Sequence, residues 1–197
     1  MKEKVLDVVA RVSARVFLGD KLCRNEEWLK ITQQYTVDSF KAAFQLNLLP
    51  SILSPVLGWI LPGCRLAKKQ FWRSRQIIEP IIAQRRQIRA KAREVNEPVP
   101  YSDDVLDWAE IESNGKPFDP ANLELFLSVA AIHTTTDLLG HTIVLLANEP
   151  DLITVLREEI VDVLKTHGLT KNALFNLKLL DSTLKESQRV KPDSLRE

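Results

Sequence analysis

The sequence predicts a mainly α-helical protein, and three observations support this. Apolar residues recur at spacings of three and four along most of the 197 residues. No segment alternates apolar and polar residues with the period of two that is typical of a strand. Glycine and proline stand where the periodic segments end. Apolar residues make up 45% of the chain, which is enough for a core and excludes wholesale disorder.

Two amphipathic helices are expected at the start. The apolar residues of the first are Val5, Val8, Val9, Val12, Val16 and Phe17, and Gly19 offers a stop. The second is expected from about Glu26 to Leu46. Its predicted apolar face consists of Leu29, Tyr35, Phe40 and Phe44.

Residues 46–63 are strongly apolar, but Pro50, Pro55 and Pro62 forbid a regular helix there. One interpretation is a buried connector. The other is a loop that touches a membrane surface or lines the entrance for an apolar ligand.

Residues 65–93 contain ten Lys or Arg and one acid, Glu79, and Pro80 is expected to kink this helix. Such a run is typical of a solvated helix face, and a docking face for an acidic partner or anionic lipid is the alternative. Nucleic acid is not expected as a partner, because the rest of the chain is acidic and the formal net charge is only +1.

Residues 94–118 are expected to form a polar connector with one amphipathic piece at 105–111. The longest helix is expected over 119–148, because Asp119 and Pro120 supply a cap and a first-turn proline. The middle of this helix is apolar nearly all round, which predicts that it is buried.

Three further helices are expected after it. The first begins at Pro150 and ends near His167, before Gly168, and the second is a short turn at 170–176. The last covers about 179–191 and stops at Pro192. The predicted inner side of the first consists of Leu152, Val155, Leu156, Ile160, Val163 and Leu164.

Three hydroxyls, on Thr134, Thr135 and Thr136, lie in the middle of the long apolar helix, one turn after the small pair Ala130 and Ala131. One interpretation is a kinked core helix whose threonines bond back to the helix. The other is a helix face on which a flat group lies close to the backbone.

His133, Asp137 and His141 share a face of the same helix. The two histidines are about 12 Å apart along the axis, so all three cannot bind one ion, and we expect no metal site here. His133 is expected to be buried and bonded to Asp137 or to a ligand. Cys23 and Cys64 form no CxxC, and no hydrolase or nucleotide-binding motif is present.

Glu186 and Arg189 lie at i and i+3 in the last helix, so they can form an ion pair on one face. An ExxR motif alone is common. Taken together, Ala130-Ala131-Ile132-His133-Thr134-Thr135 and, some fifty residues later, Glu186-Ser187-Gln188-Arg189 resemble a cytochrome P-450, a haem–thiolate monooxygenase. The resemblance covers essentially all 197 residues and is strongest to the fungal branch of ent-kaurene oxidase and indole-diterpene oxidases.

The resemblance implies a partial cytochrome P-450 fold and a role for each matching residue. Thr134 matches the threonine that delivers protons to bound oxygen, and Ala130, Ala131 and Thr134 match the helix face over the haem. His133 stands where most members have an acid. Glu186 and Arg189 match the structural charge pair behind the haem.

The resemblance also implies haem as cofactor, NADPH as electron source through a cytochrome P-450 reductase, and an apolar, terpenoid-like substrate of fungal secondary metabolism. The iron ligand is a cysteine in an FxxGxxxCxG loop, and neither cysteine of this sequence has that context. We therefore expect the 197 residues to be inactive and poorly stable alone, since the thiolate supplies electron density for O–O cleavage.

The resemblance further predicts one partial monooxygenase domain over 1–197. Its parts are 1–63 with the entrance-like loop, the basic helix 65–93, the oxygen-activating helix 119–148 and the ExxR helix 179–191. Members are anchored in the endoplasmic reticulum. No anchor or secretory signal is recognised here, so an intracellular, soluble cytoplasmic protein with peripheral membrane contact through 46–63 is expected. A non-enzymatic helical binding module, or a pseudoenzyme relic, is the alternative.

Overall fold

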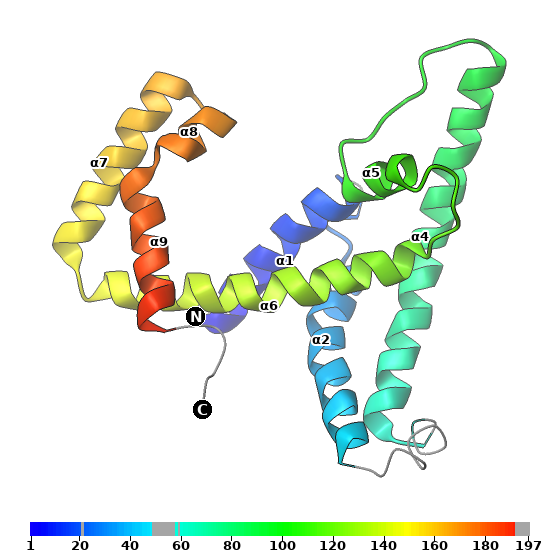
Figure 1. Cartoon of the computed structure of the whole chain (residues 1–197), viewed down its shortest axis with the longest axis horizontal. Helices are drawn as coiled ribbons and strands as arrows, with labels where there is room; N and C mark the ends of the chain where they lie inside the picture. The colour runs from blue at the N-terminus through cyan, green and yellow to red at the C-terminus, as the bar shows by residue number, and fades with distance from the viewer. Residues whose placement is uncertain (21, 49–57, 59, 192–197) are drawn as a thin grey trace. The chain divides into compact units, whose positions relative to one another are not determined.

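Within the described residues, 1–20, 22–48, 58 and 60–191, the computed structural model contains only α-helices as regular elements. In chain order they are α1 (Lys2–Leu18), α2 (Glu26–Asn47), α4 (Pro62–Glu94), α5 (Val105–Glu112), α6 (Pro120–Ala147), α7 (Pro150–His167), α8 (Lys171–Asn176) and α9 (Lys178–Val190) (Figure 1). The mainly α-helical fold class predicted from the sequence is confirmed. The apolar segment 46–63 falls mostly outside the described residues.

Most helices begin and end close to where the sequence predicted, but α4 already begins at Pro62, in the segment that was expected not to be helical. Gly19 follows α1 and Gly168 follows α7, both with positive φ, of 75° and 61°, which glycine adopts without steric cost. At the start of α6, Asp119 Oδ1 accepts hydrogen bonds from the backbone N–H groups of Ala121 and Asn122, at 3.1 and 3.2 Å. This satisfies two of the donors that a helix start leaves unpaired.

The chain divides into two compact units. The larger unit is Leu6–His133, and the smaller unit is Met1–Val5 together with Thr134–Glu197. The division falls inside α6, between His133 and Thr134.

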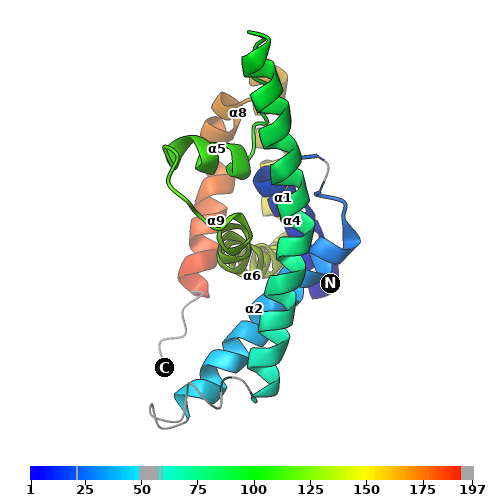
Figure 2. The ribbon, with the colours of Figure 1, turned by 90° about the vertical axis from the view of Figure 1, so that its right-hand side faces the viewer.

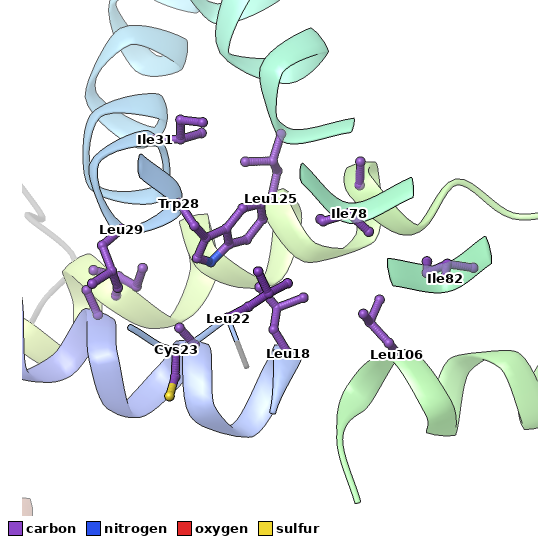
Figure 3. Close-up of a cluster of buried hydrophobic side chains, with 14 residues drawn as sticks. Leu18, Leu22, Cys23, Trp28, Leu29, Ile31, Ile78, Ile82, Leu106 and Leu125 are labelled. Carbon is purple, nitrogen blue, oxygen red and sulfur yellow. The ribbon is translucent and has the colours of Figure 1, made fainter. Parts of the chain in front are cut away.

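The core of the larger unit contains side chains from five helices. Leu18 of α1, Trp28 of α2, Ile78 of α4, Leu106 of α5 and Leu125 of α6 belong to one buried cluster, and all five are almost fully buried (Figure 3). Each such side chain stabilises the fold by roughly 1.5–3 kcal/mol relative to an exposed position. This core therefore holds α1, α2, α4, α5 and the first half of α6 together.

Small residues decide which helix faces are buried. On α1 the large side chains of Val8, Val12 and Val16 are exposed, while Ala10 and Ala14 are buried. Alanine lets another helix approach closely, and the valines then lie on the side that faces away. Of the apolar positions predicted for this helix, Val5 and Val9 are buried, whereas Val8, Val12 and Val16 are not.

The same effect occurs where α2 and α4 lie side by side (Figure 2). A side chain at Gly63 would meet the backbone of Ala42 at 3.3 Å, so the two helices are in close contact at this pair. Phe40 and Phe44, predicted on the apolar face of α2, lie away from this contact and are exposed. The predicted face is correct at Leu29, which is buried.

The helix α6 is not buried as predicted. Only 17% of its most apolar 18-residue window is buried. One stripe faces the core, Ala121, Leu125, Ser128 and Ile132, while Phe126 is 68% exposed. A helix that is apolar all round needs neighbours on every side, and the described helices cover one side.

By length and composition, α6 is also the one described helix that could cross a membrane. A core helix of a soluble protein has the same length and composition.

In the smaller unit, α8 and α9 pack against α7. Leu156 of α7, Ala173 of α8 and Leu177 are buried between them. Val155, predicted on the inner side of α7, is exposed instead, because the two short helices cover only a narrow stripe of α7. Glu159 of α7 accepts hydrogen bonds from the backbone N–H groups of Leu179 and Leu180 at 2.7 and 3.0 Å, which caps the start of α9.

Candidate functional site

The alanine and threonine positions of α6 differ in their exposure to solvent. Ala130 and Thr134 are one turn apart on the same face of the helix, and both are exposed. Ala131 is half-buried, Thr135 is exposed and Thr136 is buried. The helix therefore presents a face with a small side chain followed by a hydroxyl, as a close approach by a flat group requires.

From their spacing, His133 was expected to bond to Asp137 or to a ligand. In the structure it contacts α2 instead. Its Nε2 atom lies 3.1 Å from the backbone oxygen of Gln33 on α2, and the side chain is half-buried. Asp137 pairs with Lys2, with the amino and carboxylate groups 3.0 Å apart. His141 is half-buried, and its Nδ1 atom has no hydrogen-bond partner among the described residues.

No group of three or more His, Cys, Asp or Glu side chains suited to a metal ion occurs in the part of the chain that the structure describes. The chain has two cysteines. Cys23 is buried and its Sγ donates to the backbone oxygen of Asp20 at 3.3 Å, whereas Cys64 is half-buried in the first turn of α4.

Glu186 and Arg189 form the ion pair that their spacing predicts. The guanidinium donates to both carboxylate oxygens, at 2.7 and 2.6 Å. These hydrogen bonds lower the pKa of Glu186 and raise the pKa of Arg189. Both side chains are largely exposed, by 56% and 72%. Water therefore solvates the pair, and among the described residues the pair joins two positions of the same helix, α9.

An apolar hollow of about 420 Å³ lies beside Glu186 in the smaller unit. The C-terminal part of α6, the start of α7 and one face of α9 line it, with Leu145, Leu152 and Leu179 among the side chains. Ser187 lies at its edge, is buried and has no hydrogen-bond partner for its hydroxyl among the described residues. The hollow is thus apolar with one unsatisfied hydroxyl.

A second charged cluster was not found by sequence reasoning. Arg85 of α4 donates to both carboxylate oxygens of Asp104, at 2.8 and 2.6 Å, and to Asp107 at 2.8 Å. Arg89 pairs with Asp107 and, at 3.3 Å, with Glu110. The expectation of a solvated basic helix is therefore wrong at Arg85 and Arg89, because α5 covers them with acids.

Gly19 and Glu124 border this cluster. A Cβ at Gly19 would lie 2.8 Å from the Asp104 carboxylate, so only glycine fits there. Glu124 of α6 is fully buried, and neither carboxylate oxygen has a partner among the described residues. Burial, and then the charge of Asp104, raise the pKa of Glu124 to about 9, against the smaller effect of Arg85.

One local signal could have identified part of the cluster. Asp104 is the N-cap of α5, and its Oδ1 accepts from the backbone N–H of Asp107 at 3.1 Å. An aspartate immediately before an amphipathic segment is typical of that position. Its pairing with a side chain 19 residues earlier leaves no comparable trace in the sequence.

The chain is similar to known proteins over almost its full length. A family model described as cytochrome P450 matches residues 1–195. The cytochrome P450 monooxygenase adrA of Penicillium rubens is 46% identical over 98% of this chain and 38% of its own length. Cytochrome P450 monooxygenase 2 of Gibberella fujikuroi is 44% identical, over 98% of this chain and 41% of its own.

A third relative is the cytochrome P450 monooxygenase easM of Aspergillus fumigatus, 44% identical over 97% of this chain and 37% of its own length. The chain thus spans about two fifths of the length of these curated relatives. Family match and identities together show that this chain belongs to the cytochrome P450 family and to its fungal secondary-metabolite branch.

Proposed function

We propose that this chain is the central part of a haem monooxygenase that oxidises an apolar, terpenoid-like substrate in fungal secondary metabolism. The observation that carries the proposal is the exposed face of α6, where Ala130 is followed one turn later by the Thr134 hydroxyl. Family membership supports the same conclusion. The two compact units would then be parts of one monooxygenase domain.

The residues present fit one side of a haem. Ala130 and Ala131 leave room for a flat ring above α6, and haem, when bound, supplies the chemistry of oxygen activation. Neither Cys23, which is buried against Asp20, nor Cys64, in the first turn of α4, stands in an FxxGxxxCxG context. The thiolate that would hold the haem iron would therefore come from residues outside these 197, and we propose that the 197 residues alone do not catalyse.

Thr134 is the residue to which we assign proton transfer. A threonine Oγ1 both donates and accepts a hydrogen bond, so it can hold a proton at the open face and pass it on. Glu186 and Arg189 are assigned a structural role behind the haem. NADPH would supply electrons through a cytochrome P-450 reductase, and the whole protein would act inside the cell.

The first test is to read the transcript past codon 197 and to express the full product with a reductase. We expect an in-frame FxxGxxxCxG segment and a carbon monoxide difference spectrum of thiolate-bound haem. Thr134→Ala should lower product per NADPH consumed by about tenfold or more, since proton transfer by a positioned group contributes at least that much.

Thr135→Ala is the matched control, because Thr135 is adjacent and its side chain is also exposed. The proposal fails if the full product binds no haem, or if Thr134→Ala and Thr135→Ala behave alike. A transcript that ends at codon 197 would favour a binding module or a relic instead.

A further inference from the structure

We infer that His133 is a positioning residue, which holds the Thr134 turn of α6 to α2 through the backbone oxygen of Gln33. The inference rests on the proposed function, because Thr134 matters only if the protein is a monooxygenase. The contact itself is observed: His133 Nε2 lies 3.1 Å from Gln33 O, between residues 100 positions apart in the sequence.

The hydrogen-bond acceptor, Gln33 O, determines which ring nitrogen of His133 carries the proton. A backbone carbonyl oxygen only accepts hydrogen bonds, so His133 Nε2 must carry the proton and donate it. In a neutral imidazole, Nδ1 is then the acceptor. The contact therefore selects one tautomer, and this tautomer can be measured.

The hydrogen bond from His133 is compatible with the backbone hydrogen bonds of α2. Gln33 lies well inside α2, Glu26–Asn47, where its carbonyl also accepts the N–H of the residue four positions later. A carbonyl oxygen has a second lone pair, which the His133 ring can use. The position in α2 is thus compatible with a permanent link between the two helices.

The hydrogen bond between His133 and Gln33 is partly shielded from water. His133 and Gln33 are both half-buried. The residue before His133 in α6, Ile132, and the residue one turn before Gln33 in α2, Leu29, belong to the same buried core. The hydrogen bond therefore lies at the edge of an apolar contact. Leaving the His133 N–H and the Gln33 carbonyl unpaired there would cost free energy of folding.

The consequence for Thr134 follows from helix geometry. Adjacent residues of an α-helix point about 100° apart, so fixing the direction of His133 also fixes the direction of Thr134, which is exposed. Displacing a reacting group by about 1 Å can slow catalysis severely. Among the described residues, the contact seen for Asp137, one turn later on α6, is its ion pair with Lys2. Orientation is the role that this contact supports.

The experiment compares His133→Leu with His133→Gln in the full-length product. Leucine removes the donor, while a glutamine amide can still donate to Gln33 O. His141→Leu is the control, because His141 is half-buried on the same helix and its Nδ1 has no partner among the described residues.

Two readouts need no haem activity. We expect ¹⁵N shifts of labelled His133 typical of the Nε2–H tautomer. Amide hydrogen exchange over residues 130–138 should be about fivefold faster in His133→Leu, the effect of one neutral hydrogen bond, and should return toward wild type in His133→Gln.

The third readout is product formed per NADPH consumed. His133→Leu should lower this ratio about threefold or more with haem content unchanged, and His133→Gln should recover at least half of the loss. An Nδ1–H tautomer, unchanged exchange in His133→Leu, or equal coupling in His133→Leu and wild type would each overturn the inference. A wild-type product without monooxygenase activity would refute the proposed function, and with it the catalytic consequence of this contact.

Discussion

Two arginine–carboxylate sites in this chain have similar hydrogen-bond geometry and very different surroundings. Arg189 donates to both oxygens of Glu186 on the surface of α9, where the side chains are 72% and 56% exposed. Arg85 donates to both oxygens of Asp104, where the side chains are 17% and 1% exposed. The first pair is the one that the resemblance matched to ExxR, and the second was not singled out by the sequence analysis.

The difference shows that burial, and not motif or spacing, decides how much an ion pair matters to the stability of this chain. At the surface, water screens both charges and would solvate them equally well apart. Inside, Asp104 and Asp107 have lost most of their water, and Arg85 donates replacement hydrogen bonds to both, beside those from the Ser102 and Asp107 backbone N–H groups. The Asp104 hydrogen bonds are also the main cause of the raised pKa of Arg85.

The largest expected effect tests the buried site directly. Arg85→Met should lower the free energy of unfolding by about 3–5 kcal/mol, because it leaves the buried Asp104 without its cation and leaves Asp107 with Arg89 alone. Urea denaturation followed by circular dichroism measures it. Arg11→Met breaks an exposed pair with Asp7 and should cost less than about 1 kcal/mol. Equal losses in the two variants would remove the basis of the comparison.

The second prediction concerns how the free energy of unfolding depends on pH through Glu124, which borders the same cluster. Its folded-state pKa is about 9, against 4.5 for the ordinary side chain, so the folded chain binds the extra proton between these values. The stability that this proton contributes is present below about pH 4.5 and is lost as the pH rises through 9. The free energy of unfolding should fall by about 1 kcal/mol per unit from pH 6 to 9.

Glu124→Gln should abolish most of that decline, since an amide keeps the shape and cannot ionise. Urea midpoints measured at several pH values would check this. A decline of the same slope in Glu124→Gln would mean that another group is responsible.

An intermediate effect is expected at the cap of α9. Glu159→Ala removes the carboxylate that accepts from Leu179 and Leu180, and should cost about 1–2 kcal/mol. Glu158→Ala, an exposed neighbour on α7, should change stability by less than about 0.5 kcal/mol. Hydrogen exchange at the two leucine amides separates loss of the cap from general loosening, which would accelerate exchange throughout α9.

The smallest effect is expected at the motif itself. Arg189→Met should leave the urea midpoint of this chain unchanged, because the pair is solvated and joins residues of one helix. A clear drop in the urea midpoint would show that the ion pair stabilises contacts beyond its own turn of α9. Comparing the same substitution in the full-length product would show whether added residues bury the pair.

The sequence predicted the ends of the helices better than their buried faces. Gly19, the start of α6 at Asp119-Pro120 and the bounds of α7 were correct, because capping and φ restrictions act within a few residues. Burial of α6 and exposure of Phe40 were predicted wrongly. Hydrophobicity shows only that a side chain favours burial. The close packing of small residues, such as Ala42 against Gly63, decides which face of the helix is buried.

The candidate site divides in the same way. The order of Ala130, Thr134, Glu186 and Arg189 along the chain was sufficient to recognise the family. The partner of His133 was not predictable, because Gln33 contributes a backbone oxygen, which every residue has. Sequence alone determined the helices, their caps, the i,i+3 pair and the family, since these depend on neighbours in the chain. Only the tertiary structure decided which charges are buried, as with Arg85 and Asp104, because burial depends on residues brought together from distant positions.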